Sequence, residues 1–120
     1  MEDRIRFLKH EGKQILLVDL SGCSSAQVIT LSKIVRGFVT AHPKGSLLLL
    51  ADFTGAELDR ESLPAMQETA VFDRPHLKKS AWIGTESLPK IFYEHIKTFS
   101  RRDLPTFKTR EEALDWLVKE

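Results

Sequence analysis

The sequence has a single cysteine, Cys23, so no disulfide bond can form within the chain. Small extracellular proteins often depend on disulfides, and this lack predicts a protein of a reducing, cytoplasmic compartment. The sequence also has no large excess of charge of one sign. It contains 18 basic and 17 acidic residues, which give a net charge of +1. Proteins dedicated to nucleic acids usually carry a marked basic excess, so we expect no nucleic-acid partner.

Long apolar runs are also absent. The longest uninterrupted aliphatic stretch covers residues 47–51, far short of the roughly 20 residues that a membrane-spanning helix needs. Residues 1–10 are charged from the second position onward and lack the apolar core of a signal peptide. We therefore expect no transmembrane segment, and a length of 120 residues predicts a single domain over residues 1–120.

The sequence does contain regular apolar patterns that suit strands and helices in alternation. Short aliphatic or alternating runs predict strands at residues 5–10, 13–20, 47–51, 77–84 and around Phe107. Apolar residues at helical spacing predict helices over residues 26–42, 59–72, 87–100 and 109–117. The expected amino-terminal caps are Ser24 or Ser25, Asp59 or Ser62, and Thr109 with Glu112. The order β-β-α-β-α-β-α-β-α predicts an α/β fold with a mostly parallel central sheet and an antiparallel first strand.

This layout, with "VDLSG" at residues 18–22 and "TREEALDWL" at residues 109–117, resembles the SpoIIAA-like family of small bacterial proteins. That family belongs with the STAS domains (sulphate transporter and anti-sigma-factor antagonist) and is similar in fold to the lipid-binding SEC14-type domains. The resemblance implies a non-enzymatic binding or regulatory module whose partner is a protein or a small apolar or lipid ligand. A homodimer is a further alternative for its oligomeric state. Anti-sigma-factor antagonists are phosphorylated at a serine in an Asp-Ser-Ser-Gly motif. The matching place here reads "LDRESLPA", so the resemblance implies phosphorylation at Ser62.

Two aliphatic runs end in the same way, at "VDLSG" and at "ADFTG". Parallel strands end at one edge of a sheet, where open α/β sheets bind ligands. The residues expected to gather there in a ligand or partner rim are Asp19, Ser21, Asp52, Thr54 and Thr85. Carboxylates and hydroxyls could hold Mg²⁺, so the alternative function is a Mg²⁺-dependent phospho-acceptor or small enzyme that uses Asp19 and Asp52. We favour the other interpretation, in which each motif is an Asx turn whose carboxylate accepts hydrogen bonds from the loop.

The remaining reactive residues form no catalytic or metal-binding pattern in the sequence. The histidines that lack ligand spacing are His10, His42, His76 and His95. Cys23 is interpreted as a small buried residue, although its position before a helix leaves a nucleophilic role open. We therefore expect no catalytic residue, no metal and no cofactor.

Two further groups of residues have both a structural and a functional interpretation. Trp82 and Trp116 are assigned to the core, and exposure of Trp116 would point instead to an interface. Basic residues that could form a local cation patch, or simply offset a helix dipole, are Lys78, Lys79, Lys97, Arg101 and Arg102.

Overall fold

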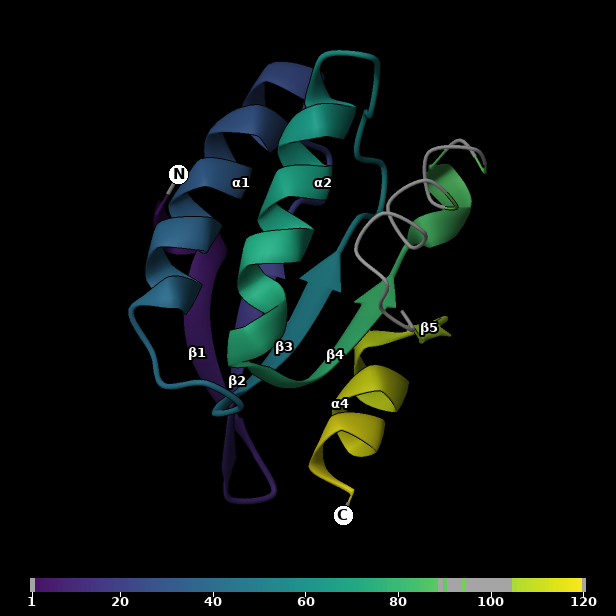
Figure 1. Cartoon of the computed structure of the whole chain (residues 1–120). Helices are drawn as coiled ribbons and strands as arrows, with labels where there is room; N and C mark the ends of the chain where they lie inside the picture. The colour runs from purple at the N-terminus through teal and green to yellow at the C-terminus, as the bar shows by residue number, and fades with distance from the viewer. Residues whose placement is uncertain (1, 89, 91–93, 95–104, 120) are drawn as a thin grey trace.

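The computed structural model describes residues 2–88, 90, 94 and 105–119, and one mixed sheet of five strands lies at its centre (Figure 1). The strands are β1 (Ile5–His10), β2 (Lys13–Asp19), β3 (Leu47–Asp52), β4 (Leu77–Ile83) and β5 (Thr106–Phe107). They follow one another across the sheet in chain order. β1 is antiparallel to β2, and every other neighbouring pair is parallel. This confirms the predicted α/β arrangement with its antiparallel first strand.

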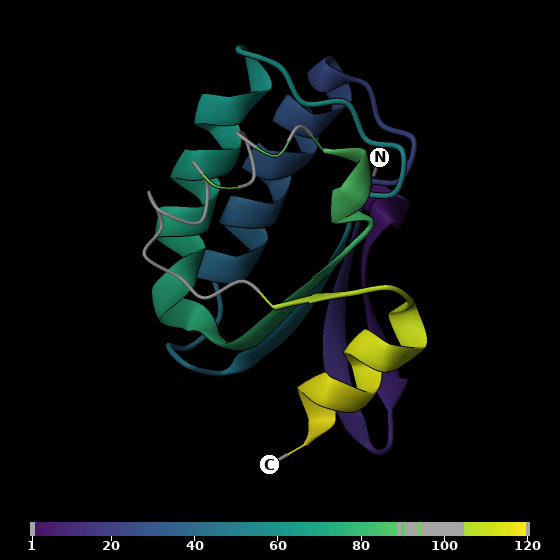
Figure 2. The same cartoon turned by 90° about the vertical axis from the view of Figure 1, so that its right-hand side faces the viewer.

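Helices cover both faces of this sheet (Figures 1 and 2). α1 (Ser25–Thr40) and α2 (Ser62–Asp73) lie side by side on one face, and α4 (Arg110–Val118) lies on the other. Short 3₁₀ helices are formed by Glu2–Arg4, Arg74–His76 and Thr85–Ser87. In the described ranges no helix has the length and apolar character that a membrane crossing requires.

The central strands are buried on both faces, as their continuous aliphatic runs predict. All six residues of β3 are buried. Because side chains alternate along a strand, β2 divides its apolar residues between the two layers. Leu16 and Val18 belong to the core beneath α1 and α2, and Ile15 and Leu17 to the core beneath α4.

Side-chain caps fix the starts of the helices. Ser24, not Ser25, caps α1 and forms a capping box with Gln27. Thr109 accepts from the Glu112 amide at the start of α4, as predicted. The carboxylate of Asp59 accepts from the amides of Glu61 and Ser62. Asp59 therefore organises the turn that leads into α2, and the helix begins three residues later than the predicted residue 59.

Two predictions from the second half of the chain have different outcomes. Trp82 is buried, as predicted. Trp116 is only half-buried at the margin of the second core, where its ring packs near Phe107 and beneath the ammonium group of Lys79. The predicted helix over residues 87–100 lies mostly outside the described residues, as do His95, Lys97, Arg101 and Arg102.

Candidate functional site

The carboxyl ends of β2, β3 and β4 lie at the same edge of the sheet. Asp19 of β2 is the Cα partner of Asp52 in β3, and Asp52 is the partner of Ile83 in β4. The two aspartates that end the similar motifs are therefore direct neighbours. Thr85 follows two residues after Ile83, in a 3₁₀ helix at this edge.

Both aspartates make the same local turn. Oδ1 of Asp19 accepts hydrogen bonds from the amide and the hydroxyl of Ser21. Oδ1 of Asp52 accepts from the amide (3.0 Å) and the hydroxyl (2.7 Å) of Thr54. These are the hydrogen bonds of the Asx turns that the repeated motif predicts. The hydroxyls of the two motifs are thus engaged by the carboxylates that precede them.

The loops that leave the three strands are packed against one another through their backbones. The Gly22 amide donates to the Thr54 carbonyl at 2.9 Å. The Phe53 amide donates to the Ile83 carbonyl, also at 2.9 Å. A Cβ atom on Gly84, whose φ is +72°, would lie only 2.3 Å from the Thr54 nitrogen. The rim is therefore a closely packed backbone structure and not an open groove between loops.

Two arginines neutralise the pair of carboxylates. The guanidinium of Arg110, the first residue of α4, donates to Oδ2 of Asp52 through Nε (3.0 Å) and Nη2 (2.8 Å). The same Nη2 lies 3.5 Å from Oδ2 of Asp19. Arg4 donates to the carbonyls of Asp19 and Ser21 and lies 4.0 Å from the Asp19 carboxylate. The sequence analysis did not include either arginine in the rim.

The position of Arg110 is unfavourable for its own helix. A cation at a helix amino terminus opposes the helix dipole. Arg110 nevertheless occupies the first position of α4 and reaches across to the aspartates. A basic residue directly after a predicted helix cap was the only sequence signal for this contact, because 58 positions separate Arg110 from Asp52.

The environment of Asp19 favours its charged form. Burial raises the pKa of this carboxyl, but the hydrogen bonds from Ser21 and the charges of Arg110 and Arg4 lower it further than burial raises it. The pKa of Asp19 therefore lies below its ordinary value.

We expect Asp19→Asn to lower the free energy of unfolding by about 1 kcal/mol at neutral pH, because a partly buried ion pair and charge-assisted hydrogen bonds are lost. A carboxyl whose pKa falls on folding stabilises the protein fully above the unfolded pKa of about 3.9, and this contribution is lost as the pH falls through the lower folded pKa. Urea unfolding of both proteins across this acidic range measures the difference, which should shrink with acidification. A difference independent of pH would contradict the assigned role of the carboxylate.

A protein cation, the Arg110 guanidinium, already lies beside the carboxylates of the rim. A metal ion shared by Asp19 and Asp52 would need the carboxylate oxygens that face Arg110. The guanidinium supplies positive charge at that position, and Oδ1 of each aspartate is occupied by its own turn. The residues present therefore fit an internally neutralised rim better than a Mg²⁺ site.

A second group with metal-ligand chemistry lies at the β1–β2 turn. His10, Glu11 and Asp115 offer ligand atoms within 4.8 Å of one another. Nε2 of His10 is 2.7 Å from Oδ1 of Asp115, so these two side chains already contact each other. The sequence analysis missed this group because Asp115 is far away in the chain.

Ser62 and Cys23 are both buried. Ser62 is fully buried, and its hydroxyl accepts a hydrogen bond from the Asp59 amide at 2.9 Å. Phosphorylation of Ser62 stays a prediction that requires local opening of this turn. Burial raises the pKa of the Cys23 thiol, which disfavours the nucleophilic thiolate.

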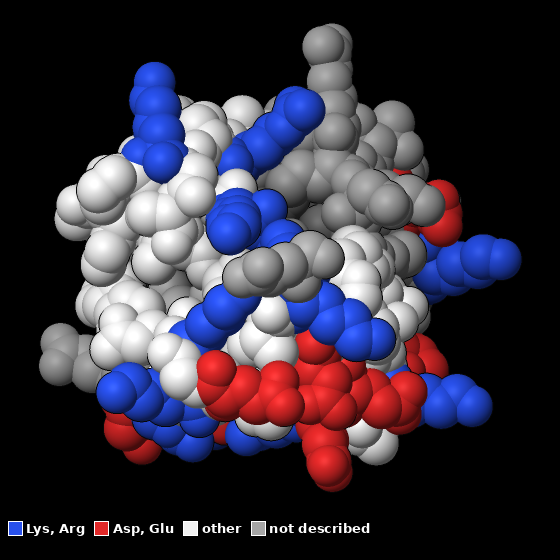
Figure 3. Space-filling view, turned by 90° about the horizontal axis from the view of Figure 1, so that it is seen from below, with Lys and Arg blue, Asp and Glu red and all other residues white. Residues whose placement is uncertain are grey.

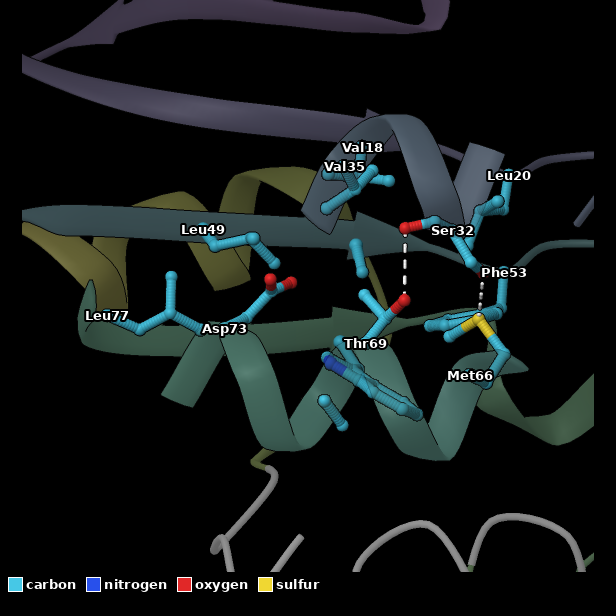
Figure 4. A pocket seen from close by; sticks show the side chains of 13 residues that line it. Val18, Leu20, Ser32, Val35, Leu49, Phe53, Met66, Thr69, Asp73 and Leu77 are labelled. Atoms are coloured by element: carbon cyan, nitrogen blue, oxygen red, sulfur yellow. Dashed lines mark hydrogen bonds between the residues drawn. The ribbon is translucent and has the colours of Figure 1, made fainter. Parts of the chain in front are cut away.

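A small apolar cavity lies between the helices and the sheet (Figure 4). Its volume is about 40 Å³, and its lining is mostly aliphatic and aromatic. Ser32 and Thr69 contribute polar atoms, but the Thr69 hydroxyl already donates a hydrogen bond to the Ser32 carbonyl at 3.0 Å. Figure 4 also shows the carboxyl group of Asp73, a buried residue, directed toward this space. The sequence patterns gave no indication that Asp73 would be buried.

Comparison with protein families and with curated proteins found no relative. No protein-family model matches the chain, and no curated protein matches it significantly. The functional argument therefore depends on the geometry of the described residues.

Proposed function

We propose that the chain is a non-enzymatic binding or regulatory module of STAS-like type that acts through a protein partner in the cytoplasm. The observation that carries this proposal is the internal neutralisation of the carboxyl-edge rim. Asp19 and Asp52 are the residues best placed for chemistry, and their oxygens face Ser21, Thr54 and Arg110. An antiparallel first strand followed by parallel strands also agrees with the family resemblance.

The size of the internal cavity favours a protein partner over an apolar ligand. Pockets for drug-sized ligands measure roughly 300–1,000 Å³, whereas the cavity beneath α1 and α2 measures about 40 Å³. A lipid chain would therefore require the two helices to separate from the sheet. A protein partner requires no such change, because it uses the outer surface.

Regulation at Ser62 would act by disrupting the entry to α2. A phosphate on its hydroxyl would lie beside the Asp59 carboxylate, whose Oδ1 is 3.3 Å away. The added negative charge would repel that carboxylate and remove the hydroxyl from its hydrogen bond with the Asp59 amide. Phosphorylation at this position would thus change the surface formed by the turn before α2.

The experiment first separates a binding module from the Mg²⁺-dependent alternative. We expect millimolar Mg²⁺, with or without acetyl phosphate, to leave the amide resonances of Asp19 and Asp52 unshifted in two-dimensional NMR spectra. The intact protein should form no acyl phosphate by mass spectrometry. A saturable shift at both aspartates, or a phosphorylated aspartate, would replace the proposal with the enzymatic alternative.

A positive test measures a stoichiometric complex in cells that produce the chain. Native size-exclusion chromatography after crosslinking should place the chain in a defined assembly, with a second protein species identified in fixed ratio. The matched variants Phe72→Ser and Phe7→Ser remove exposed aromatic side chains from α2 and β1 and would locate the contact. A chain that elutes only as a monomer under all these conditions would contradict a protein-binding role.

A further inference from the structure

A second surface lies at the opposite end of the sheet, where the parallel strands begin. An open hollow of about 800 Å³ is bordered there by the starts of β2 and β4 and by the end of α4. Its lining residues are Lys13, Gln14, Ser46, Leu48, Lys78, Lys79, Leu117 and Lys119. Four of these described residues are lysines and none is acidic. Figure 3 shows basic side chains gathered across the centre of this end of the molecule, with acidic side chains beside them.

A β-bulge allows two adjacent lysines to border the same hollow. Leu47 pairs with Leu77, but Leu48 pairs with Lys79, so Lys78 is one extra residue in β4. In a regular strand, neighbouring side chains point to opposite faces. The bulge changes this alternation, and both Lys78 and Lys79 line the hollow. Bulges are frequent where a side chain must be redirected at a binding or catalytic site.

Two of the lysines are held in place by the end of α4. Nζ of Lys79 donates to the carbonyls of Trp116 (2.6 Å) and Lys119 (3.0 Å). Nζ of Lys13 donates to the Val118 carbonyl at 3.0 Å. These contacts satisfy carbonyls at the helix terminus, which gives both lysines a structural role. They also fix two ammonium groups at the wall of the hollow.

The other two lysines have no such role among the described residues. Lys78 and Lys119 are exposed, and their ammonium groups make no hydrogen bond or ion pair within the described part of the chain. Helix capping therefore accounts for half of the positive charge around the hollow. The clustering also has a cost, because burial and the charges of Lys13, Lys78 and Lys119 lower the pKa of Lys79.

We propose that this lysine hollow binds a phosphate-bearing ligand with more than one negative charge. Lysine binds phosphate as a point charge through its rotatable ammonium donors. Hydrogen-bonded ammonium groups on Lys13 and Lys79, with exposed ones on Lys78 and Lys119, provide a partly organised site for several phosphate oxygens. This proposal concerns a surface separate from the carboxyl-edge rim and does not depend on the protein partner proposed above.

The test uses inorganic pyrophosphate as the probe, titrated at constant ionic strength and followed by calorimetry and two-dimensional NMR. We expect saturable shifts at the amides of Lys13, Ser46 and Lys78. The double variant Lys78→Gln/Lys119→Gln should bind about thirtyfold more weakly, because two cations near the phosphates are lost. The matched double variant Lys9→Gln/Lys33→Gln removes two exposed lysines elsewhere and should bind like the unchanged protein.

A vesicle arm identifies the source of the phosphate. Co-sedimentation is compared for phosphatidylcholine vesicles with and without a phosphatidylinositol phosphate. Hollow-dependent binding to the phosphorylated vesicles supports the site and assigns it to a lipid headgroup, while binding to pyrophosphate alone supports a soluble ligand. No saturable binding to either probe, or equal loss in both double variants, would overturn the proposal.

Discussion

Gly84→Ala is expected to lower the free energy of unfolding by about 3 kcal/mol. The φ angle of Gly84 is +72°, a conformation that costs an alanine roughly 1–2 kcal/mol. The new methyl group would also lie 2.3 Å from the Thr54 nitrogen and 2.5 Å from its hydroxyl oxygen. Thr54 cannot withdraw easily, because both of these groups donate to Oδ1 of Asp52. Relief of the clash must therefore separate the exits of β3 and β4.

Gly45→Ala provides the control for backbone conformation. Gly45 has a similar φ of +66°, but a Cβ atom there meets nothing within 4 Å. We expect it to cost about 1 kcal/mol, so the difference between the variants isolates the contact with Thr54. Urea unfolding monitored by tryptophan fluorescence gives both free energies. Equal losses in the two variants would show that the close approach at the rim contributes nothing to stability.

The parts of the fold that could be predicted are those encoded by neighbouring residues. The aliphatic runs that became β2 and β3 have a composition suited to strands buried on both faces, and their burial confirms this. The repeated "Asp-x-Ser/Thr-Gly" pattern predicts a turn closed within three residues, and those hydrogen bonds are present in both copies. Local chemistry of this kind needs no knowledge of the rest of the chain.

The parts that could not be predicted depend on contacts between distant residues. Arg110 reaches Asp52 only because α4 packs against the face opposite α1 and α2. The sequence analysis grouped Lys78 with Lys79, but their meeting with Lys13 and Lys119 at one hollow depends on the bulge in β4 and on the contact of α4 with the sheet. A basic residue directly after the predicted cap Thr109 could have marked Arg110 as a candidate for a long-range ion pair. The sequence would still not have identified Asp52 as its partner.

The two ends of the sheet therefore differ in how their charges are arranged. At the carboxyl edge, the aspartates are matched by arginines of the same chain. At the amino edge, four lysines border one hollow, and Lys13 and Lys79 donate there to carbonyl groups at the end of α4. Internally matched charges stabilise a fold, whereas a concentration of one sign in a hollow is suited to an external ion. This contrast is why we assign structure to the rim and binding to the hollow.

Arg110→Met is expected to lower the free energy of unfolding by about 2 kcal/mol, because it removes the partly exposed arginine from an ion pair whose carboxylate is buried. The side chain of Asp52 is only 7% exposed. Methionine keeps much of the apolar volume of arginine, but it removes both hydrogen bonds to Oδ2 of Asp52. The carboxylate would then be left with only the Thr54 donors on its other oxygen. Removal of the positive charge at the start of α4 relieves its unfavourable interaction with the helix dipole, which offsets only a few tenths of a kcal/mol.

Three further variants show whether the loss arises from the ion pair. Arg60→Met removes an exposed arginine before α2 and should change stability by less than about 0.5 kcal/mol. Arg110→Lys keeps the charge without the two-pronged geometry and should recover part of the loss. Asp52→Asn/Arg110→Met removes both charges, so it should be more stable than Arg110→Met alone, since no uncompensated carboxylate remains. If the double variant is instead less stable than Arg110→Met alone, the aspartate and the arginine are not coupled, and the rim is held by its turns alone.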